Sequence, residues 1–230
     1  VIETLRSDFL TQGPQVPNFE NKIAQYCEAK FAVATSNATA SLHLACLALG
    51  VGKGDIVWTS PISFVASSNC ALYCGAEVDF VDVEINTGLM SVTALENKLK
   101  QAAEENRLPK VVIPVHLTGQ SCDMARISKL AETFNFKVIE DASHAIGSAY
   151  KASPVGSCKY SDICVFSFHP VKIITTGEGG IATTNSDEIA QKLRQLRSHG
   201  VVRDPSALSS EEEGAWYYEQ RELGFNYRLT

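Results

Sequence analysis

Residues 31–49 read FAVATSNATASLHLACLAL: an apolar run, a short turn of small polar residues, and a helix-like stretch. The run Phe31 to Thr35 is typical of a β-strand, and the stretch Thr39 to Leu49 predicts an amphipathic helix. The same strand-then-helix unit recurs along the chain. Further strands are expected over 56–59, 78–81, 111–115, 138–140, 164–168 and 181–184. Further helices are expected over 64–73, 92–105, 124–134 and 187–198. Apolar strands that alternate with helices predict an α/β fold: three αβα layers around a mostly parallel sheet covered on both faces.

Composition excludes several classes of protein. The 230 residues suffice for one large or two small domains, and the net charge of -6 provides no basic surface for nucleic acid. No apolar run reaches the ~20 residues that span a bilayer, and no secretion signal is visible. The seven cysteines are expected to be small buried hydrophobes in a reducing, cytoplasmic setting. Cys70 and Cys74, one helical turn apart, leave a metal pair as the alternative, although no further ligand completes such a site.

Polar residues follow several of the expected strands, where ligands of an open parallel sheet bind. Small polar residues at 36–40 open a helix, and a helix N-terminus suits a phosphate; the alternative is a simple N-cap by Ser36 or Asn37. Phe64 follows the strand over 56–59. Its ring can lie on a flat ligand, or it can belong to the core.

Two further strands are followed by residues that can titrate. Asp141 can hold a ring nitrogen in its protonated form, or cap a helix; His144, close behind it, can equally be an interfacial histidine. At the end of the strand over 164–168, Ser167 can donate to a phosphate. His169 can stack on a ligand, move a proton, or be a buried structural histidine.

Lys172 lies between an apolar strand and the glycine-rich turn 175–180. Neighbouring Pro170, Val171 and Ile173 suggest an amine shielded from water, and burial disfavours its charged form. A neutral amine can form a Schiff base with a carbonyl. The alternative is a surface lysine in a loop. Together, a phosphate seat, a ring stacker, a ring-nitrogen acid and such a lysine are what pyridoxal 5′-phosphate (PLP) requires.

The chain resembles the DegT/DnrJ/EryC1/StrS family of sugar-nucleotide aminotransferases over nearly its whole length. The matching motifs occupy residues 7–14, 36–40, 59–66, 140–147, 166–180 and 224–228. The resemblance implies the large domain of the PLP-dependent transferase fold type I. Within the family, the chain is most similar to the branch that aminates a UDP-linked 4-keto-6-deoxy sugar on the pseudaminic acid pathway. That closer match rests on residues 36–46, 71–76 and 169–172.

The resemblance implies a role for each matching residue. Lys172 would bind PLP covalently and later move a proton, and Asp141 would keep the pyridine nitrogen protonated. Phe64 would stack on the ring, and His144 would lie near its hydroxyl. The phosphate would be held by Ala38, Thr39 and Ser167.

The resemblance also implies a homodimer with a shared active site. Asn226 would reach the phosphate of the cofactor in the neighbouring subunit. The residues expected around the substrate are Thr11, Gln12, Gly13, His169 and Arg228.

The implied reaction transfers an amino group from L-glutamate to PLP, and then to a UDP-linked 4-keto-6-deoxy sugar, in a ping-pong sequence. The alternatives are a dTDP- or GDP-keto sugar, a PLP-dependent sugar dehydratase, and a PLP-binding fragment without catalysis. Some family dehydratases carry histidine in place of the lysine, so Lys172 favours transamination. Residues 1–230 are expected to be the PLP-binding large domain, with the family's smaller C-terminal domain absent and its first helix clipped. No metal, nucleic acid or membrane partner is expected.

Overall fold

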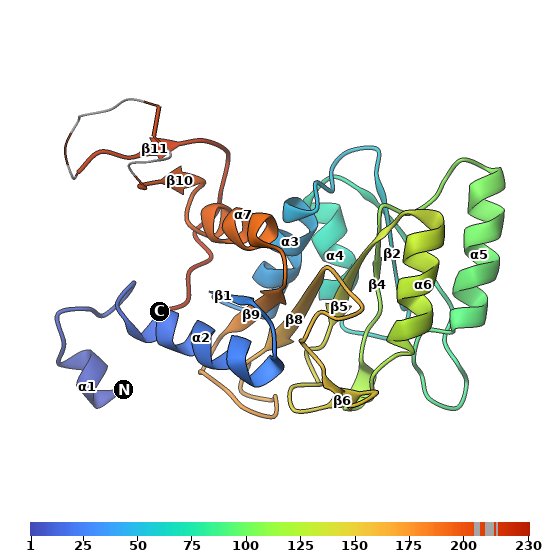
Figure 1. Cartoon of the computed structure of the whole chain (residues 1–230), viewed down its shortest axis with the longest axis horizontal. Helices are drawn as coiled ribbons and strands as arrows, with labels where there is room; N and C mark the ends of the chain where they lie inside the picture. Colours follow the sequence, from blue (N-terminus) through green and yellow to red (C-terminus); the bar gives the residue numbers. More distant parts are fainter. Residues whose placement is uncertain (205–207, 210–213, 215) are drawn as a thin grey trace.

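A seven-stranded sheet is the middle layer of the molecule (Figure 1). The structure is a computed structural model that describes residues 1–204, 208–209, 214 and 216–230. The sheet has the order β1-β9-β8-β5-β4-β2-β3. Its strands are β1 (Phe31–Thr35), β2 (Ile56–Thr59), β3 (Glu77–Phe80), β4 (Val111–Ile113), β5 (Lys137–Asp141), β8 (Ile163–Ser167) and β9 (Gly180–Thr184). Only β9 runs antiparallel to its neighbours β1 and β8, which confirms the mostly parallel sheet.

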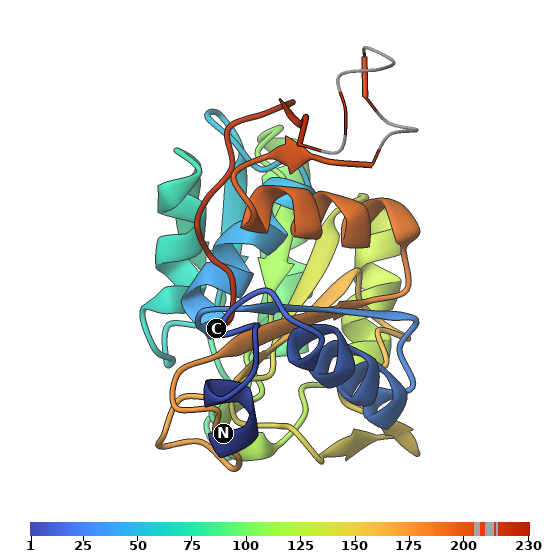
Figure 2. The same ribbon diagram turned by 90° about the vertical axis from the view of Figure 1, so that its left-hand side faces the viewer.

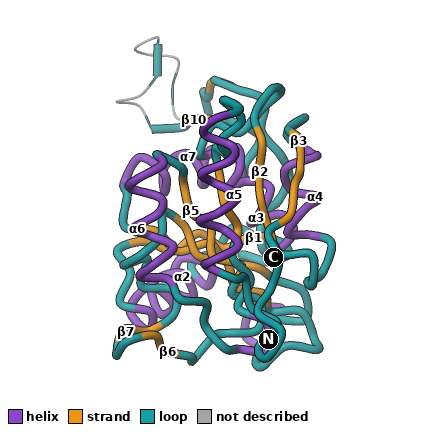
Figure 3. The backbone as a smooth tube through the Cα atoms, turned by 90° about the vertical axis from the view of Figure 1, so that its right-hand side faces the viewer, coloured by secondary structure: helices purple, strands orange, loops and turns teal. Residues whose placement is uncertain are grey.

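Helices cover both faces of the sheet, so the expected three-layer αβα fold is confirmed. One face packs on α3 (Ala38–Ala48), α4 (Ala66–Tyr73) and α7 (Asp187–Arg197). The other face packs on α2 (Gln15–Cys27), α5 (Val92–Glu104) and α6 (Met124–Phe134). Figure 2 shows α2 and α7 on opposite sides of the sheet, and Figure 3 shows α5 and α6 side by side.

Side chains along each strand alternate between the two faces of the sheet, and each face has its own hydrophobic core. In β4, Val111 and Ile113 face the α3 side, whereas Val112 faces α5 and α6. In β5, Ile139 faces α3, and Val138 faces the opposite layer. Because successive side chains of a strand point to opposite faces, the next two residues of β5, Glu140 and Asp141, also diverge.

Glu140 is buried beneath the sheet in a polar network of its own. Its carboxylate lies 2.7 Å from Nε2 of His116 and accepts a hydrogen bond from the Ser161 hydroxyl. The backbone N–H of Cys122 donates to Nδ1 of the same ring at 3.2 Å, so the proton of the imidazole lies on Nε2 and points to Glu140. The network satisfies a carboxylate that would otherwise be buried at a high cost.

The helix predicted over 39–49 is present as α3, but the expectation that it is amphipathic is wrong. Helix α3 lies between the sheet, α4 and α7, and it is buried on nearly every side. Its N-terminus touches β9: a Cβ on Gly180 would lie 2.3 Å from the carbonyl carbon of Asn37 and 2.5 Å from the nitrogen of Ala38. Glycine at position 180 therefore permits this close approach.

Two predicted boundaries differ from the observed ones by two residues, whereas the others agree to within one residue. The strand expected over 111–115 ends at Ile113, because Pro114 has no N–H to donate to the ladder. The helix expected over 64–73 begins at Ala66, which leaves Phe64 in the preceding turn.

The remaining elements lie outside the sheet. They are α1 (Ile2–Leu5), the 3-10 turn η1 (Leu117–Gly119), and the strand pairs β6 (Ala149–Tyr150) with β7 (Ser153–Pro154) and β10 (Val201–Val202) with β11 (Glu219–Gln220). Residues 202–214 are the most loop-like stretch of the sequence, and they lie in large part outside the described residues. Within the described part, no helix has the length and apolarity to cross a membrane, and no group of three ligand side chains could hold a metal.

Candidate active site

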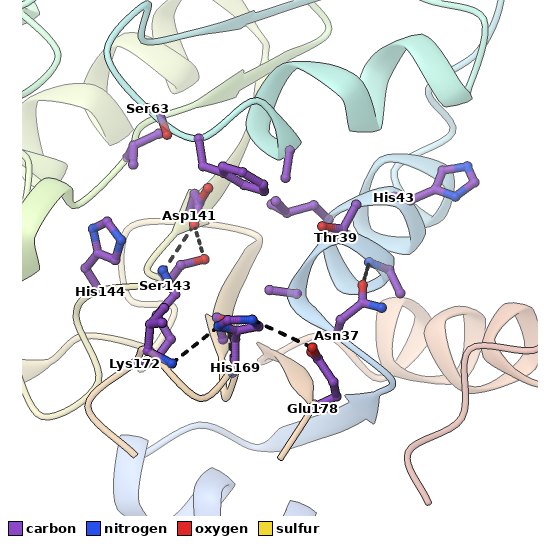
Figure 4. Close-up of a pocket in the computed structure, with 18 of the residues that line it drawn as sticks. Asn37, Thr39, His43, Ser63, Asp141, Ser143, His144, His169, Lys172 and Glu178 are labelled. Carbon is purple, nitrogen blue, oxygen red and sulfur yellow. Dashed lines mark hydrogen bonds and ion pairs between the residues drawn. The ribbon is translucent and has the colours of Figure 1, made fainter. Parts of the chain in front are cut away.

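A cavity of about 790 Å³ opens at the carboxyl ends of β5 and β8 and the N-terminus of α3. Eight side chains expected at a cofactor or substrate site line it: Ala38, Thr39, Phe64, Asp141, His144, Ser167, His169 and Lys172. Figure 4 shows Thr39 and Asn37 at one end of the cavity and His144 at the other, with Asp141 facing Lys172 and His169 across it. The structure thus brings these eight residues, expected from the sequence, into one cavity.

The α3 end of the cavity has the features of a phosphate seat. Asn37 caps the helix, and its Oδ1 accepts a hydrogen bond from the N–H of Ala40 at 2.8 Å. The N–H groups of Ala38 and Thr39, in the same first turn, have no acceptor within the helix and carry its positive dipole end. The hydroxyl of Ser167 accepts from the N–H of His169 at 3.4 Å, so its own proton remains free to donate. The N-cap bond of Asn37 uses the N–H of Ala40, so the N–H groups of Ala38 and Thr39 remain available to a phosphate.

Asp141 lies at the cavity floor, only 4% exposed. Its Oδ2 accepts from the hydroxyl of Ser67 at 2.6 Å, and its Oδ1 accepts from the hydroxyl and the N–H of Ser143 at 2.6 and 3.1 Å. Among the described residues, no lysine or arginine pairs with it. A buried carboxylate of this kind fits a cationic group in the cavity, as a protonated pyridine nitrogen is. No helix begins at Asp141, so the helix-cap alternative is wrong.

Phe64 forms part of the cavity wall with 73% of its surface exposed. The alternative that it belongs to the core is therefore wrong. An exposed aromatic ring beside a cavity is available to stack on a flat ligand.

Lys172 is half-buried at the cavity. The expectation that its apolar neighbours in sequence shield the amine from water is wrong. Val171, Ile173 and Ile174 are exposed, because the chain here is a turn that directs them outward. The backbone N–H of Lys172 donates to the carbonyl of His169 at 2.9 Å, which closes that turn. Lys172 lines the main cavity together with Val171, whereas Ile173 and Ile174 line a different one.

His144 is held as a neutral ring. Burial, and next the charge of Lys172, lower its pKa below the usual 6.5, against a smaller opposite effect of Asp141. The N–H of Thr118 donates to Nδ1 at 3.3 Å, so the proton of the neutral ring lies on Nε2. His144 is thus prepared to donate a hydrogen bond to an oxygen.

His169 is partly exposed, which excludes the buried structural histidine. Its Nδ1 accepts from the N–H of Val171 at 3.3 Å, and its Nε2 lies 3.7 Å from the carboxylate of Glu178. Glu178, in the glycine-rich turn, also lines the cavity, and sequence reasoning assigned it no role.

Several other residues of the site were missed. Ser63, Ser143, His43, Tyr73 and Tyr227 line the cavity, and Ser67 lies directly behind it. Ser143 could have been found, since an aspartate side chain commonly accepts a hydrogen bond from the backbone N–H two residues on. His43 lies one helical turn after Thr39, but its contact with Tyr227, 184 residues away, depends on the fold.

Five expected site residues lie outside the main cavity. Gln12, Gly13 and Arg228 line a separate cavity of about 150 Å³ beside the Glu20–Arg197 ion pair. Thr11 is exposed, and Asn226 is exposed and pairs with Ser198 in an isolated β-bridge. A single chain therefore does not bring them to Lys172.

Comparison with known proteins gives a family match over the whole chain. The model of the "DegT/DnrJ/EryC1/StrS aminotransferase family" matches residues 1–230. The UDP-4-amino-4,6-dideoxy-N-acetyl-β-L-altrosamine transaminase of Campylobacter jejuni is 41% identical over 228 residues, covering 99% of this chain and 56% of its own. The GDP-perosamine synthase of Caulobacter vibrioides is 39% identical over 231 residues, covering 100% and 57%.

Solved structures agree with the fold. PseC of Helicobacter pylori, an aminotransferase involved in the biosynthesis of pseudoaminic acid, superposes with a TM-score of 0.86 at 32% identity, over 99% of this chain and 57% of its own. The PLP form of the sugar aminotransferase Spr1654 from Streptococcus pneumoniae has a TM-score of 0.83 at 29% identity, over 100% and 59%. This chain thus spans little more than half the length of the proteins it matches.

Proposed function

Since this chain belongs to the DegT/DnrJ/EryC1/StrS aminotransferase family, we propose that it supplies the PLP-binding large domain of an enzyme that aminates a keto-sugar nucleotide. PLP is the cofactor of this family. The observation that carries the proposal is the convergence of Asp141, Lys172 and the α3 N-terminus on one cavity. A surface lysine in a loop would not face a buried carboxylate that has no cationic side-chain partner among the described residues.

The residues fit the cofactor by its three polar ends. The N–H groups of Ala38 and Thr39 and the hydroxyl of Ser167 bind the phosphate. Asp141 accepts from the ring nitrogen and keeps it protonated. His144 donates Nε2–H to the ring hydroxyl; in support, it lies at the end of the cavity away from Thr39.

PLP, when bound, supplies an aldehyde that captures an amine and a ring that accepts electrons. Lys172 supplies the amine that holds the cofactor, and then moves a proton between its C4′ and the carbon of the amino donor or sugar. Phe64 covers one face of the ring and excludes water from it. Asp141 stabilises positive charge on the ring nitrogen, which makes the ring the electron acceptor.

The proposed donor is L-glutamate, and the proposed acceptor is a UDP-linked 4-keto-6-deoxy sugar of the pseudaminic acid type. The 41% identity to the Campylobacter jejuni transaminase supports this acceptor. A GDP-linked keto sugar is the second candidate, supported by the 39% identity to the GDP-perosamine synthase. In support of a sugar site there, the side chains of His169 and Glu178 line the cavity and are partly exposed.

We also propose that a second copy of the chain completes the site. Asn226 and Arg228, with the segment Thr11 to Gly13, lie away from the cavity of their own chain. In a dimer they would reach the phosphate and the substrate of the partner's site. Mixing a Lys172→Ala protein with an Asn226→Ala protein tests this: hybrid dimers should regain one intact site, and mixtures without regained activity would refute the sharing.

The function itself is tested by spectroscopy and then by turnover. Reconstitution with PLP should give a visible absorbance band that borohydride bleaches and that Lys172→Ala removes. A band that survives Lys172→Ala unchanged would refute the role of this lysine. The protein with PLP, L-glutamate and a panel of UDP-, dTDP- and GDP-keto sugars should release more than one equivalent of 2-oxoglutarate per site with one member of the panel. Cofactor binding with no release of 2-oxoglutarate beyond the level without sugar, on any member, would instead favour a PLP-binding protein without this catalysis.

A further inference from the structure

The buried hydroxyl of Ser67 connects helix α4 to the catalytic floor. Its Oγ lies 2.6 Å from Oδ2 of Asp141, and Ser67 is only 1% exposed. Ser67 does not line the cavity, so it touches Asp141 from behind. It is therefore placed to act through the carboxylate and not on a ligand.

The direction of the hydrogen bonds follows from the chemistry of the groups. A carboxylate only accepts, so the Ser67 proton points to Asp141. The hydroxyl of Ser63 lies 3.2 Å from that of Ser67, whose proton is already used, so Ser63 is the donor of that pair. The result is a chain Ser63 to Ser67 to Asp141 in which each bond polarises the next.

The two oxygens of Asp141 are held by different elements. Ser143, in the turn that follows β5, binds Oδ1 with two donors. Only Ser67, from α4, binds Oδ2 among the described residues. Donors on both oxygens fix the plane of the carboxylate, and removing Ser67 would free its rotation on one side.

Ser67 also links the carboxylate to the ring stacker. Its backbone N–H donates to the carbonyl of Phe64 at 3.3 Å, three residues earlier, in the turn that opens α4. One residue thus contacts both the floor, through its hydroxyl, and the wall, through its backbone. A flat ligand would lie between these two groups, where a small misplacement costs rate.

We propose that Ser67 is the positioning residue of Asp141, and that its hydroxyl holds the carboxylate in the orientation that keeps the PLP ring nitrogen protonated. The inference rests on the proposed function. It assigns Ser67 a role at the same site, as a residue that never contacts the cofactor.

Two quantities test the proposal in the PLP-loaded protein. The first is the rate of the half-reaction with L-glutamate, which should fall roughly ten- to hundredfold in Ser67→Ala, the loss expected for a hydrogen bond to a charged group. The second is the pH midpoint of the visible band. A less firmly protonated ring nitrogen repels a second positive charge less, so the midpoint should move to higher pH.

Matched variants separate positioning from folding. Ser67→Thr keeps the hydroxyl and should recover most of the rate and the parent midpoint. Ser68→Ala, the adjacent serine whose hydroxyl binds the Val65 carbonyl at 2.9 Å, should leave both unchanged. Ser63→Ala removes the outer donor of the chain and should shift both in the same direction by less. This variant also tests the chain should Ser67→Ala not fold.

Three outcomes are decisive. A Ser67→Ala protein that matches Ser68→Ala in both rate and midpoint overturns the positioning role and leaves the proposed function intact. If Ser67→Ala does not fold, a Ser63→Ala protein that matches the parent in both rate and midpoint overturns the positioning role in the same way. A parent protein that gives no visible band with PLP overturns the proposed function, and the role of Ser67 with it.

Discussion

Gly180→Ala tests whether the close contact between β9 and α3 builds the phosphate seat. The new Cβ would lie 2.3, 2.4 and 2.5 Å from C and O of Asn37 and N of Ala38. These are backbone atoms and cannot rotate away. Ordinary carbon contacts begin near 3.4 Å, so the α3 N-terminus must move by 3.4 − 2.3, or about 1 Å.

The displacement has an energetic and a functional consequence. Overpacking of this kind typically costs about 1–3 kcal/mol, so the free energy of unfolding should fall by that amount. The same movement carries the N–H groups of Ala38 and Thr39 away from Ser167, and affinity for PLP should fall more than the loss of stability alone explains. Urea unfolding measures the first quantity, and fluorescence titration with PLP measures the second.

Gly52→Ala is the matched control. A Cβ at Gly52 meets nothing within 4 Å, and Gly52 lies in a turn far from the α3 N-terminus. This variant should keep the parent's stability and cofactor affinity. If Gly180→Ala behaves like Gly52→Ala in both assays, the contact with β9 does not position the helix, and the argument for the seat fails.

Three further changes have defined outcomes. Phe64→Ala should leave thermal stability within about 0.5 kcal/mol because the ring is exposed, yet weaken PLP binding by about 1 kcal/mol as stacking is lost; unchanged affinity in a PLP titration would refute the stacking. The lowered pKa of His144 means that the unfolded state binds more protons on this ring near and below pH 6.5, so stability falls as pH falls; His144→Gln should flatten that fall between about pH 7.5 and 5.5 in urea titrations, and an equal slope would contradict it. Glu20→Ala removes the carboxylate that accepts from Arg197 and from the Ala34 N–H at 2.8 Å, and should cost about 3 kcal/mol in the same assay, whereas a loss below about 1 kcal/mol would show the pair to be dispensable.

Local patterns in the sequence predicted the fold and eight of the residues that line the cavity, because each of these residues lies at or soon after the end of a strand or at the start of the helix that follows it. Asp141 ends β5, and Ser167 ends β8, so the topology alone brings them to one edge of the sheet. The expected shielding of Lys172 by its sequence neighbours is wrong for a physical reason. Apolar neighbours in sequence shield a side chain only if the backbone turns them toward it, and here it turns them to solvent.

Contacts between distant segments could not be predicted in this way. Ser67 and Asp141 are 74 residues apart, and nothing in either segment indicates the other. The burial of α3 on nearly every side was missed for a related reason. A helix with small and apolar residues all round is indistinguishable from a weakly amphipathic one until the second layer of helices is placed above it.

The two adjacent acids of β5, Glu140 and Asp141, favour one register of this strand in the sheet. Glu140 finds its partners in His116 and Ser161 below the sheet, and Asp141 finds Ser67 and Ser143 above it. A slip of one residue would exchange the two faces, leaving a longer carboxylate in the cavity and the shorter one short of His116. Misaligned pairing would thus leave two buried carboxylates without their hydrogen-bond partners. The pair of carboxylates that supplies Asp141 to the cavity therefore also makes a chain with the wrong strand alignment unstable.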